Sequence, residues 1–250
     1  ICRMPLAGGS EGCVPLGRHA TSLAWYPDSR ALLFCDSRGI WMMDQNDKQH
    51  LLMEGSVNEL AMAGSRMVFG RSTRDMNIWR TDLESGRTAK IIASSEEDSE
   101  PEFSPDGEQI LFRSKRNGSY ELYMCDRNGQ RVRQLTRLGA HSGSARWSPD
   151  GRWIAFDSDY RAPGEPKDAT PYNNIFVIAA AGGGGEPRKL TDSTKERMVP
   201  GWSHDSRWVY YTEEPGSRRE TWKVPVAGGP AVLVSATEMF DMIESSDGQW

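Results

Sequence analysis

Short apolar runs alternate with turn signals along most of the chain. Residues 103–107 (Phe-Ser-Pro-Asp-Gly) precede the apolar run at 109–112, and residues 147–151 (Trp-Ser-Pro-Asp-Gly) precede the run at 153–156. Proline presets φ at the second turn position, aspartate hydrogen-bonds locally, and glycine takes the left-handed conformation that closes the turn. Each unit therefore predicts two β-strands joined by a tight turn, with a structural role for the turn aspartate.

The turn signal repeats through the whole chain. Its copies stand at Asp28, Asp106, Asp150, Asp205 and Asp247, with a degenerate copy at 63–64 that lacks both proline and aspartate. Successive copies lie roughly 42 residues apart, which is the length of a four-stranded propeller blade. The run at 153–156 is apolar at consecutive positions, and such a strand is buried on both faces, as blades packed between two neighbours require.

The two ends of the chain resemble complementary parts of one blade. Residues 1–5 repeat a third-strand pattern, and residues 240–250 supply a first strand and its turn. We expect residues 1–6 to join the sheet of residues 240–244, because ring closure covers edge strands that would otherwise promote aggregation.

The sequence therefore predicts an all-β fold: a six-bladed β-propeller of four-stranded antiparallel blades, closed by N- and C-terminal strands that share a blade. We expect a single domain over residues 1–250. The expected blades are 1–16 with 240–250, 20–54, 56–94, 99–137, 143–192 and 198–236. A two-sheet sandwich is the alternative, but it does not explain a sequence repeat of this length.

Charge and hydropathy narrow the classes of partner. The chain of 250 residues has a net charge of −5 and 26% charged residues, which is an ordinary surface without a basic footprint for nucleic acid or for a membrane. No apolar run reaches the length of about 18 residues that a membrane span needs. We therefore expect a protein or peptide partner, no direct nucleic acid contact, no membrane insertion and a monomeric domain.

The four cysteines do not indicate a zinc site, because no two of them form a Cys-x-x-Cys pair. Cys2, Cys35 and Cys125 lie within or beside apolar strand patterns, where a free cysteine behaves as a small buried hydrophobic residue. A bridge between Cys2 and Cys13 is the alternative. The cysteines are therefore compatible with both a reducing and an oxidising compartment.

The repeats resemble those of the WD40-like Pro-Asp propellers of the TolB-like group. Residues 103–136 carry nearly the whole pattern, from the aromatic residue and Ser-Pro-Asp-Gly to Leu-Thr at 135–136, and residues 147–191 carry it again. The resemblance implies a bacterial, non-catalytic interaction module. Such propellers occur alone in the periplasm, ahead of serine peptidase domains, and behind winged-helix domains in regulators. The resemblance therefore favours a periplasmic location, and a cytoplasmic location is the alternative.

Two glycine-rich segments match catalytic or phosphate-binding motifs in sequence but lack the context that these motifs need. Residues 8–12 contain Gly-x-Ser-x-Gly, but that elbow needs a strand before it and a helix after it, whereas the repeat predicts a hairpin here. The glycines at 182–185 are not followed by the Lys-Ser/Thr of a phosphate loop. No cofactor is expected. Calcium is the alternative, because it prefers oxygen ligands and four carboxylates could supply them, although their spacing is not that of an EF-hand. These carboxylates are Asp157, Asp159, Glu165 and Asp168.

No set of nucleophile, base and orienting group can be assembled from these motifs, so we predict a chain that is not an enzyme. The expected function is that of a protein- or peptide-binding or sensor scaffold. The alternative is an accessory propeller of a serine peptidase or another hydrolase, gating access of its substrate. A third possibility is a lyase or hydrolase built on the propeller loops.

A partner-binding site is predicted where the first strand of each blade begins, beside the long connection at 158–173. Positions there vary in charge and size from blade to blade, which packing alone does not require and a non-repeating ligand would. The predicted mouth of the channel consists of Asp98, Glu100, His141, Ser142, Tyr160, Arg161, Tyr172, Arg197, Met198, Phe240 and Asp241. Unselected loop variation is the alternative interpretation.

Overall fold

The computed structural model places strands, with no helix, in the part of the chain that it describes. The described residues are 1–3, 12–16, 19–36, 38–55, 57–72, 76–94, 96–161, 172–181, 185–192, 195–214, 219–236, 242 and 244–245.

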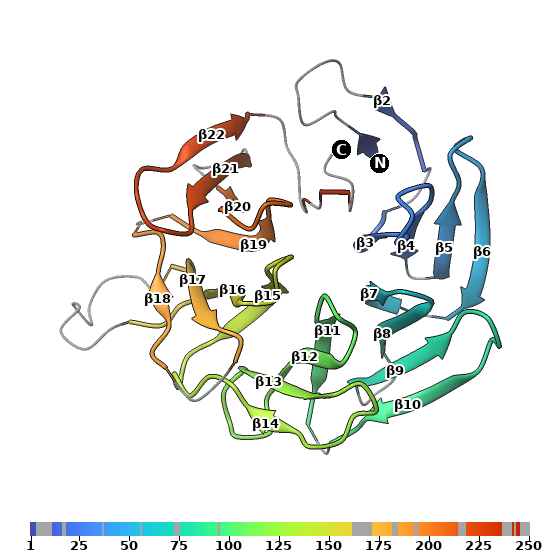
Figure 1. The fold of residues 1–250 in the computed structure, drawn as a ribbon, viewed down its shortest axis with the longest axis horizontal. Coiled ribbons are helices and arrows are strands. Elements are labelled where there is room, and N and C mark those ends of the chain that lie inside the picture. Colours follow the sequence, from blue (N-terminus) through green and yellow to red (C-terminus); the bar gives the residue numbers. More distant parts are fainter. Residues whose placement is uncertain are drawn as a thin grey trace.

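Five four-stranded antiparallel sheets stand as blades around a central axis, and the region along this axis is called the channel below (Figure 1). Blade one consists of β3 (Ser22–Trp25), β4 (Leu32–Asp36), β5 (Gly39–Met43) and β6 (Gln49–Glu54). Blade two consists of β7 (Val57–Ala63), β8 (Arg66–Ser72), β9 (Met76–Asp82) and β10 (Thr88–Ile92). Blade three consists of β11 (Asp98–Phe103), β12 (Gln109–Ser114), β13 (Glu121–Asp126) and β14 (Arg133–Gln134).

Blade four consists of β15 (Ser142–Trp147), β16 (Trp153–Ser158), β17 (Asn174–Ala179) and β18 (Arg188–Lys189). Blade five consists of β19 (Arg197–Trp202), β20 (Trp208–Glu213), β21 (Glu220–Pro225) and β22 (Val232–Ser235). In every blade the first strand in sequence lies nearest the channel and the fourth lies at the rim (Figure 1).

The prediction of six blades is wrong, because the structure has five. The terminal strands β1 (Cys2–Arg3) and β2 (Gly12–Cys13) form a separate two-stranded sheet with two residue pairs. Of residues 240–244, only Met242 and Glu244 are described, and neither lies in a strand. A four-stranded blade needs three ladders, whereas the described terminal segments supply one. The expected pairing of residues 1–6 with residues 240–244 is therefore absent from the described part of the chain.

The described terminal segments pack against the two blades that flank the opening in the ring (Figure 1). Val14 contacts the hydrophobic cluster of blade one that contains Phe34. On the other side, the Glu244 carboxylate accepts hydrogen bonds from the backbone N–H of His204 at 2.6 Å and from the hydroxyl of Tyr210 at 2.9 Å. Burial and this carboxylate raise the pKa of Tyr210.

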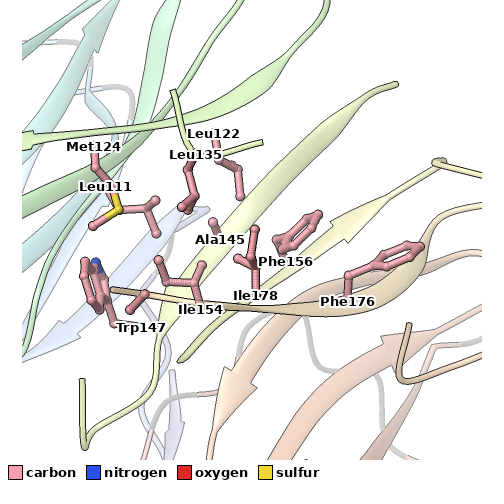
Figure 2. Close-up of a cluster of buried hydrophobic side chains, with 11 residues drawn as sticks. Leu111, Leu122, Met124, Leu135, Ala145, Trp147, Ile154, Phe156, Phe176 and Ile178 are labelled. Carbon is pink, nitrogen blue, oxygen red and sulfur yellow. The ribbon is translucent and has the colours of Figure 1, made fainter. Parts of the chain in front are cut away.

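Hydrophobic cores fill the spaces between neighbouring blades. Figure 2 shows the core between blades three and four, where Ile154 and Phe156 of β16 face blade three. Ala155, between them in sequence, belongs to the core on the other side, with Trp202 of blade five. Successive strand residues point to opposite faces, so β16 is buried on both, as the sequence predicted.

The Ser-Pro-Asp-Gly turns hold themselves together through their side chains. Ser104 donates from its hydroxyl to Asp106 Oδ1 at 2.6 Å, and the backbone N–H of Glu108 donates to the same oxygen at 3.0 Å. These hydrogen bonds lower the pKa of the Asp106 carboxyl. Gly107 has a φ of 71°, which favours glycine. Corresponding hydrogen bonds recur in the turns of blades four and five.

Two of the four cysteines are free and buried in the sheets. Burial raises the pKa of the Cys35 and Cys125 thiols to about 12, so both stay protonated, as predicted for small hydrophobic residues. Cys13 is disulfide-bonded, and its backbone lies opposite that of Cys2 in the β1–β2 pair. The prediction of free, buried cysteines is therefore confirmed for Cys35 and Cys125, whereas Cys13 forms a disulfide bond.

Candidate functional site: the central channel

The inner strands of blades two to five each contain a β-bulge. The ladder between first and second strand shifts register between 57 and 59, 99 and 102, 143 and 146, and 198 and 201. In the last three blades one residue of the bulge has a left-handed backbone: Glu100 (φ 52°), Ser144 (φ 48°) and Val199 (φ 55°). A bulge leaves a backbone N–H outside the ladder, and such a group needs another acceptor.

A carboxylate of the preceding blade accepts from each of these left-handed residues. Glu59 Oε2 accepts from the N–H of Glu100 at 3.0 Å, and Glu100 Oε2 accepts from the N–H of Ser144 at 2.5 Å. Asp157 Oδ2 accepts from the N–H of Val199 at 3.1 Å. Glu59, Glu100 and Asp157, called here the carboxylate belt, therefore link blades two to five.

Blade one is linked by a hydroxyl instead. Ser22 Oγ accepts from the backbone N–H of Leu60 in blade two at 3.3 Å. The link runs in the same direction as the carboxylate belt, from a side chain of one blade to the backbone of the next. Ser22 and Glu100 occupy the same repeat position, six residues before the turn aspartates Asp28 and Asp106, and each serves as a hydrogen-bond acceptor for the next blade.

Burial raises the pKa values of two carboxyl groups in the belt. It raises the pKa of Glu59 to about 7, with the nearby charge of Glu100 adding to the shift, and it raises the pKa of Asp157 to about 6. Arg113 lies beside the belt, with its Nη1 2.6 Å from Glu100 Oε1 and its Nη2 3.1 Å from Glu97 Oε1. Desolvation alone would lower the pKa of Arg113, but Glu100 and Glu97 raise it, so the guanidinium stays charged.

Towards the Pro-Asp turns, the channel opens into a cavity of about 400 Å³. Apolar side chains of the inner strands form much of its wall, and Glu102, Arg146 and Glu244 add charges. Glu102 also accepts from the backbone N–H of Trp147 at 2.9 Å. The lining comes from the first strands of blades one to four, the turns of blades one to three and Glu244: Leu23, Ala24, Trp25, Tyr26, Pro27, Leu60, Ala61, Met62, Ala63, Gly64, Pro101, Glu102, Phe103, Pro105, Arg146 and Glu244.

Two residues of the predicted mouth are fully buried within their own blades. Asp98 forms an ion pair with Arg116 at 2.7 Å. The hydroxyl of Ser142 lies 3.1 Å from that of Ser158, within hydrogen-bonding distance. These contacts hold adjacent strands together. Glu100, from the same prediction, belongs to the carboxylate belt.

The residues of the predicted mouth around blade four are more accessible. His141 is exposed, and its ring packs edge-on against Tyr120 with centroids 5.1 Å apart. Tyr172 is 37% exposed. Tyr160 is half-buried, with its ring centroid 6.1 Å from that of Phe176, and Arg161 is also half-buried.

In blade five, Arg197 pairs with Glu213 at 2.6 Å and stacks over the ring of Tyr211. Met198 is half-buried and accepts from the Thr212 hydroxyl through its backbone oxygen at 3.2 Å. Phe240, Asp241 and most of the 158–173 connection lie outside the described residues.

Sequence reasoning missed both the cavity and most of the belt. Glu102 and Arg146 stand four residues before the turn aspartates at 106 and 150, each directly before the aromatic residue that ends its inner strand. That shared offset was an available signal for the cavity. The belt had no such signal, because Glu59 and Glu100 lie on first strands whereas Asp157 lies on a second strand.

The residues considered for calcium have backbone partners where the structure describes them. Among the described residues, no three His, Cys, Asp or Glu side chains converge in a way that could hold a metal ion. Asp157 and Asp159, considered above for calcium, accept from the backbone N–H groups of Val199 and His141. Glu165 and Asp168 lie outside the described part. Within that part, no helix has the length and apolar character to cross a membrane.

These features define an all-β propeller with four-stranded antiparallel blades. A family model described as "TolB beta propeller domain" (PD40) matches residues 61–163. A solved structure described as "The structure of putative TolB from Agrobacterium tumefaciens" has a TM-score of 0.76 at 16% identity, covering 93% of this chain and 88% of that one. Residues 61–163 therefore match the TolB β-propeller family, and the fold of the described chain is similar to that of a TolB-like propeller.

Curated relatives resemble shorter parts of the chain. "Protein TolB homolog" of Chlorobium chlorochromatii is 44% identical over 50 residues, which cover 20% of this chain and 11% of that protein. "Uncharacterized peptidase YuxL" of Bacillus subtilis is 23% identical over 164 residues, which cover 54% of this chain and 25% of that protein. The chain thus matches a quarter or less of the length of these two relatives.

Proposed function

We propose that this chain is a binding module that admits an extended segment of a protein partner into the turn-end cavity of its channel and catalyses no reaction itself. The observation that carries the proposal is the cavity of about 400 Å³ between the inner strands. Cavities of this size, with apolar walls and a few polar groups, are typical of binding sites.

The composition of the wall favours a peptide segment. Leu23, Leu60 and Met62 offer apolar contact, while Glu102 and Arg146 offer charges of both signs. A peptide presents apolar side chains and hydrogen-bonding backbone together, so it can use both kinds of contact. The channel is also bounded by separate blades, which lets one segment touch several of them at once.

The absence of catalysis is part of the proposal. An activated nucleophile needs a base within hydrogen-bond reach. The contacts that the structure gives to two histidine rings are with other groups: His50 with the Asp44 carboxylate at 3.4 Å, and His141 with the Tyr120 ring. Neither contact pairs the histidine ring with a serine, threonine or cysteine nucleophile, which supports a non-catalytic role.

A second candidate function follows from the Bacillus relative, whose name describes a peptidase and of which the chain matches 25%. In this version the propeller is an accessory unit that guides substrate segments to a peptidase domain. Both versions place a peptide segment in the channel.

Display of random nine-residue peptides on phage, selected against the immobilised chain, tests the proposal. Met62→Trp should fill the cavity and weaken an enriched peptide at least about tenfold, which corresponds to 1.4 kcal/mol. The matched control is Leu51→Trp, which adds the same ring on β6 at the rim of blade one and should leave affinity unchanged. Unchanged binding by Met62→Trp would refute the cavity as the site.

The predicted mouth is tested in the same assay. Arg161→Ala combined with Tyr172→Ala should leave peptide affinity within about twofold if the turn-end cavity is the site. A large loss in this double variant, with Met62→Trp unaffected, would move the site to the predicted mouth. Turnover of ester or peptide substrates by the purified chain would overturn the non-catalytic part.

A further inference from the structure

The outer strands of the blades differ in how they are protected. β14 and β18 contain two residues each, Arg133–Gln134 and Arg188–Lys189, and β10 carries Lys90. Short strands and cationic side chains discourage pairing with a strand of another molecule. β22 has neither protection, because it runs over four residues, Val232–Ser235, without a charge.

The aliphatic side chains of β22 are exposed at three consecutive positions. Val232 is 45% exposed, Leu233 is 46% and Val234 is 36%. The strand is the last in the order β19-β20-β21-β22, so one backbone edge pairs with β21 and no described strand pairs with the other. Figure 1 shows it at the rim of blade five. An uncharged aliphatic edge of this kind is a template for another β-strand.

We propose that β22 is a self-association edge that pairs antiparallel with β22 of a second copy of this chain. The sequence Val-Leu-Val at 232–234 reads the same in both directions. Antiparallel pairing about Leu233 therefore places Leu233 opposite Leu233 of the other copy and Val232 opposite its Val234. In a two-fold antiparallel pair each contact of one copy is repeated by the other, so here aliphatic side chains meet only aliphatic side chains, and such cross-strand pairs stabilise the contact.

The other apolar rim strand fits this role less well. β6 exposes Leu51 and Leu52, but its sequence Gln-His-Leu-Leu-Met-Glu is not symmetric. Antiparallel self-pairing about its leucines would place His50 opposite Met53 and leave the charge of Glu54 at the edge. In β22, by contrast, self-pairing about Leu233 places only uncharged aliphatic side chains opposite each other.

The size of the edge sets the strength of association. Three exposed aliphatic residues bury well under the roughly 1,000 Å² of a stable interface, so the dimer should be weak and reversible. A dissociation constant on the order of 100 μM is expected. This edge lies at the rim and the proposed peptide site lies in the channel, so each can be tested without the other.

Sedimentation equilibrium of the chain over about 10 to 500 μM tests the proposal. The average mass of the wild type should rise towards twice that of the monomer. Leu233→Lys places a charge at the centre of the pair and should remain monomeric. Leu51→Lys, which adds the same charge to the exposed edge of β6, should associate like the wild type.

Hydrogen exchange at backbone amides gives a second measurement on the wild type. Residues 232–234 should exchange several-fold more slowly at high concentration than at low, while residues 49–54 should not change. A wild type that stays monomeric at 500 μM would overturn the proposal and retain the monomeric domain expected from the sequence. Association that survives Leu233→Lys, or that protects residues other than β22, would also overturn it.

Discussion

Two regions of the molecule, the carboxylate belt and the turn-end cavity, use charged groups for different tasks. In the carboxylate belt, Glu59, Glu100 and Asp157 accept from backbone N–H groups that the bulges release. At the turn end, Glu102 and Arg146 line a cavity together with apolar side chains. Charges inside a propeller channel therefore do not by themselves indicate a binding site, because the bulged backbone uses some of them.

This difference explains why variety between blades is an ambiguous signal. The position occupied by Ser22 in blade one and Glu100 in blade three supplies an acceptor for the next blade in both cases. The two residues differ in reach and charge, yet their hydrogen bonds perform the same structural task. A binding cavity is recognised only when side chains of several blades leave space between them.

Removal of the central belt residue should have the largest effect. Glu100→Ala leaves the partly buried N–H of Ser144 without its acceptor and takes away a partner of Arg113. The free energy of unfolding should fall by about 3 kcal/mol, measured by urea denaturation. His141→Ala, at an exposed position, is the control and should stay within about 0.5 kcal/mol of the wild type. A stable Glu100→Ala variant that no longer binds the selected peptide would place binding at the belt instead.

The pH dependence of stability should distinguish the belt from surface carboxylates. The folded-state pKa values of Glu59 (about 7) and Asp157 (about 6) lie above the ordinary values near 4, so the folded state holds more protons between these limits. Stability should therefore rise as pH falls from about 7.5 to 5, by on the order of 2 kcal/mol, and be lost again as pH rises through the folded pKa values.

Glu59→Gln is the matched variant for this measurement, because its amide oxygen can still accept from Glu100 while the titrating group is gone. Its stability should change less between pH 5 and 7.5 than that of the wild type. Carboxyls whose pKa is lowered, such as Asp106 and Glu97, favour the folded state above about pH 4 and cause the loss of stability expected in stronger acid. An unchanged slope in Glu59→Gln would contradict the assignment.

The turns should show the smallest effect. Asp150→Ala removes the acceptor for the Ser148 hydroxyl and for the backbone N–H of Arg152. Because the turn is exposed, the loss should be about 1 kcal/mol in thermal or urea unfolding. Peptide affinity should stay unchanged, since Asp150 does not line the turn-end cavity. A loss of binding at full stability would extend the functional surface from the cavity to the turns.

Local chemistry explains what the sequence predicted correctly. The turn at 104–107 and the strand at 153–158 depend on residues close together in the chain, so proline, aspartate and apolar runs are enough to identify them. The repeat of these units also predicted the propeller architecture and four strands per blade. Each of these features is complete within one blade.

Only the tertiary structure decided the number of blades, the belt and the cavity. Blade number depends on pairing between segments near residues 1 and 250, which no local pattern measures. Asp157 finds the N–H of Val199 across a blade boundary, and Met62 and Arg146 face one cavity although a whole blade separates them in sequence. These relations depend on how blades stack around the axis, and stacking is set by side-chain packing between segments that are distant in the chain.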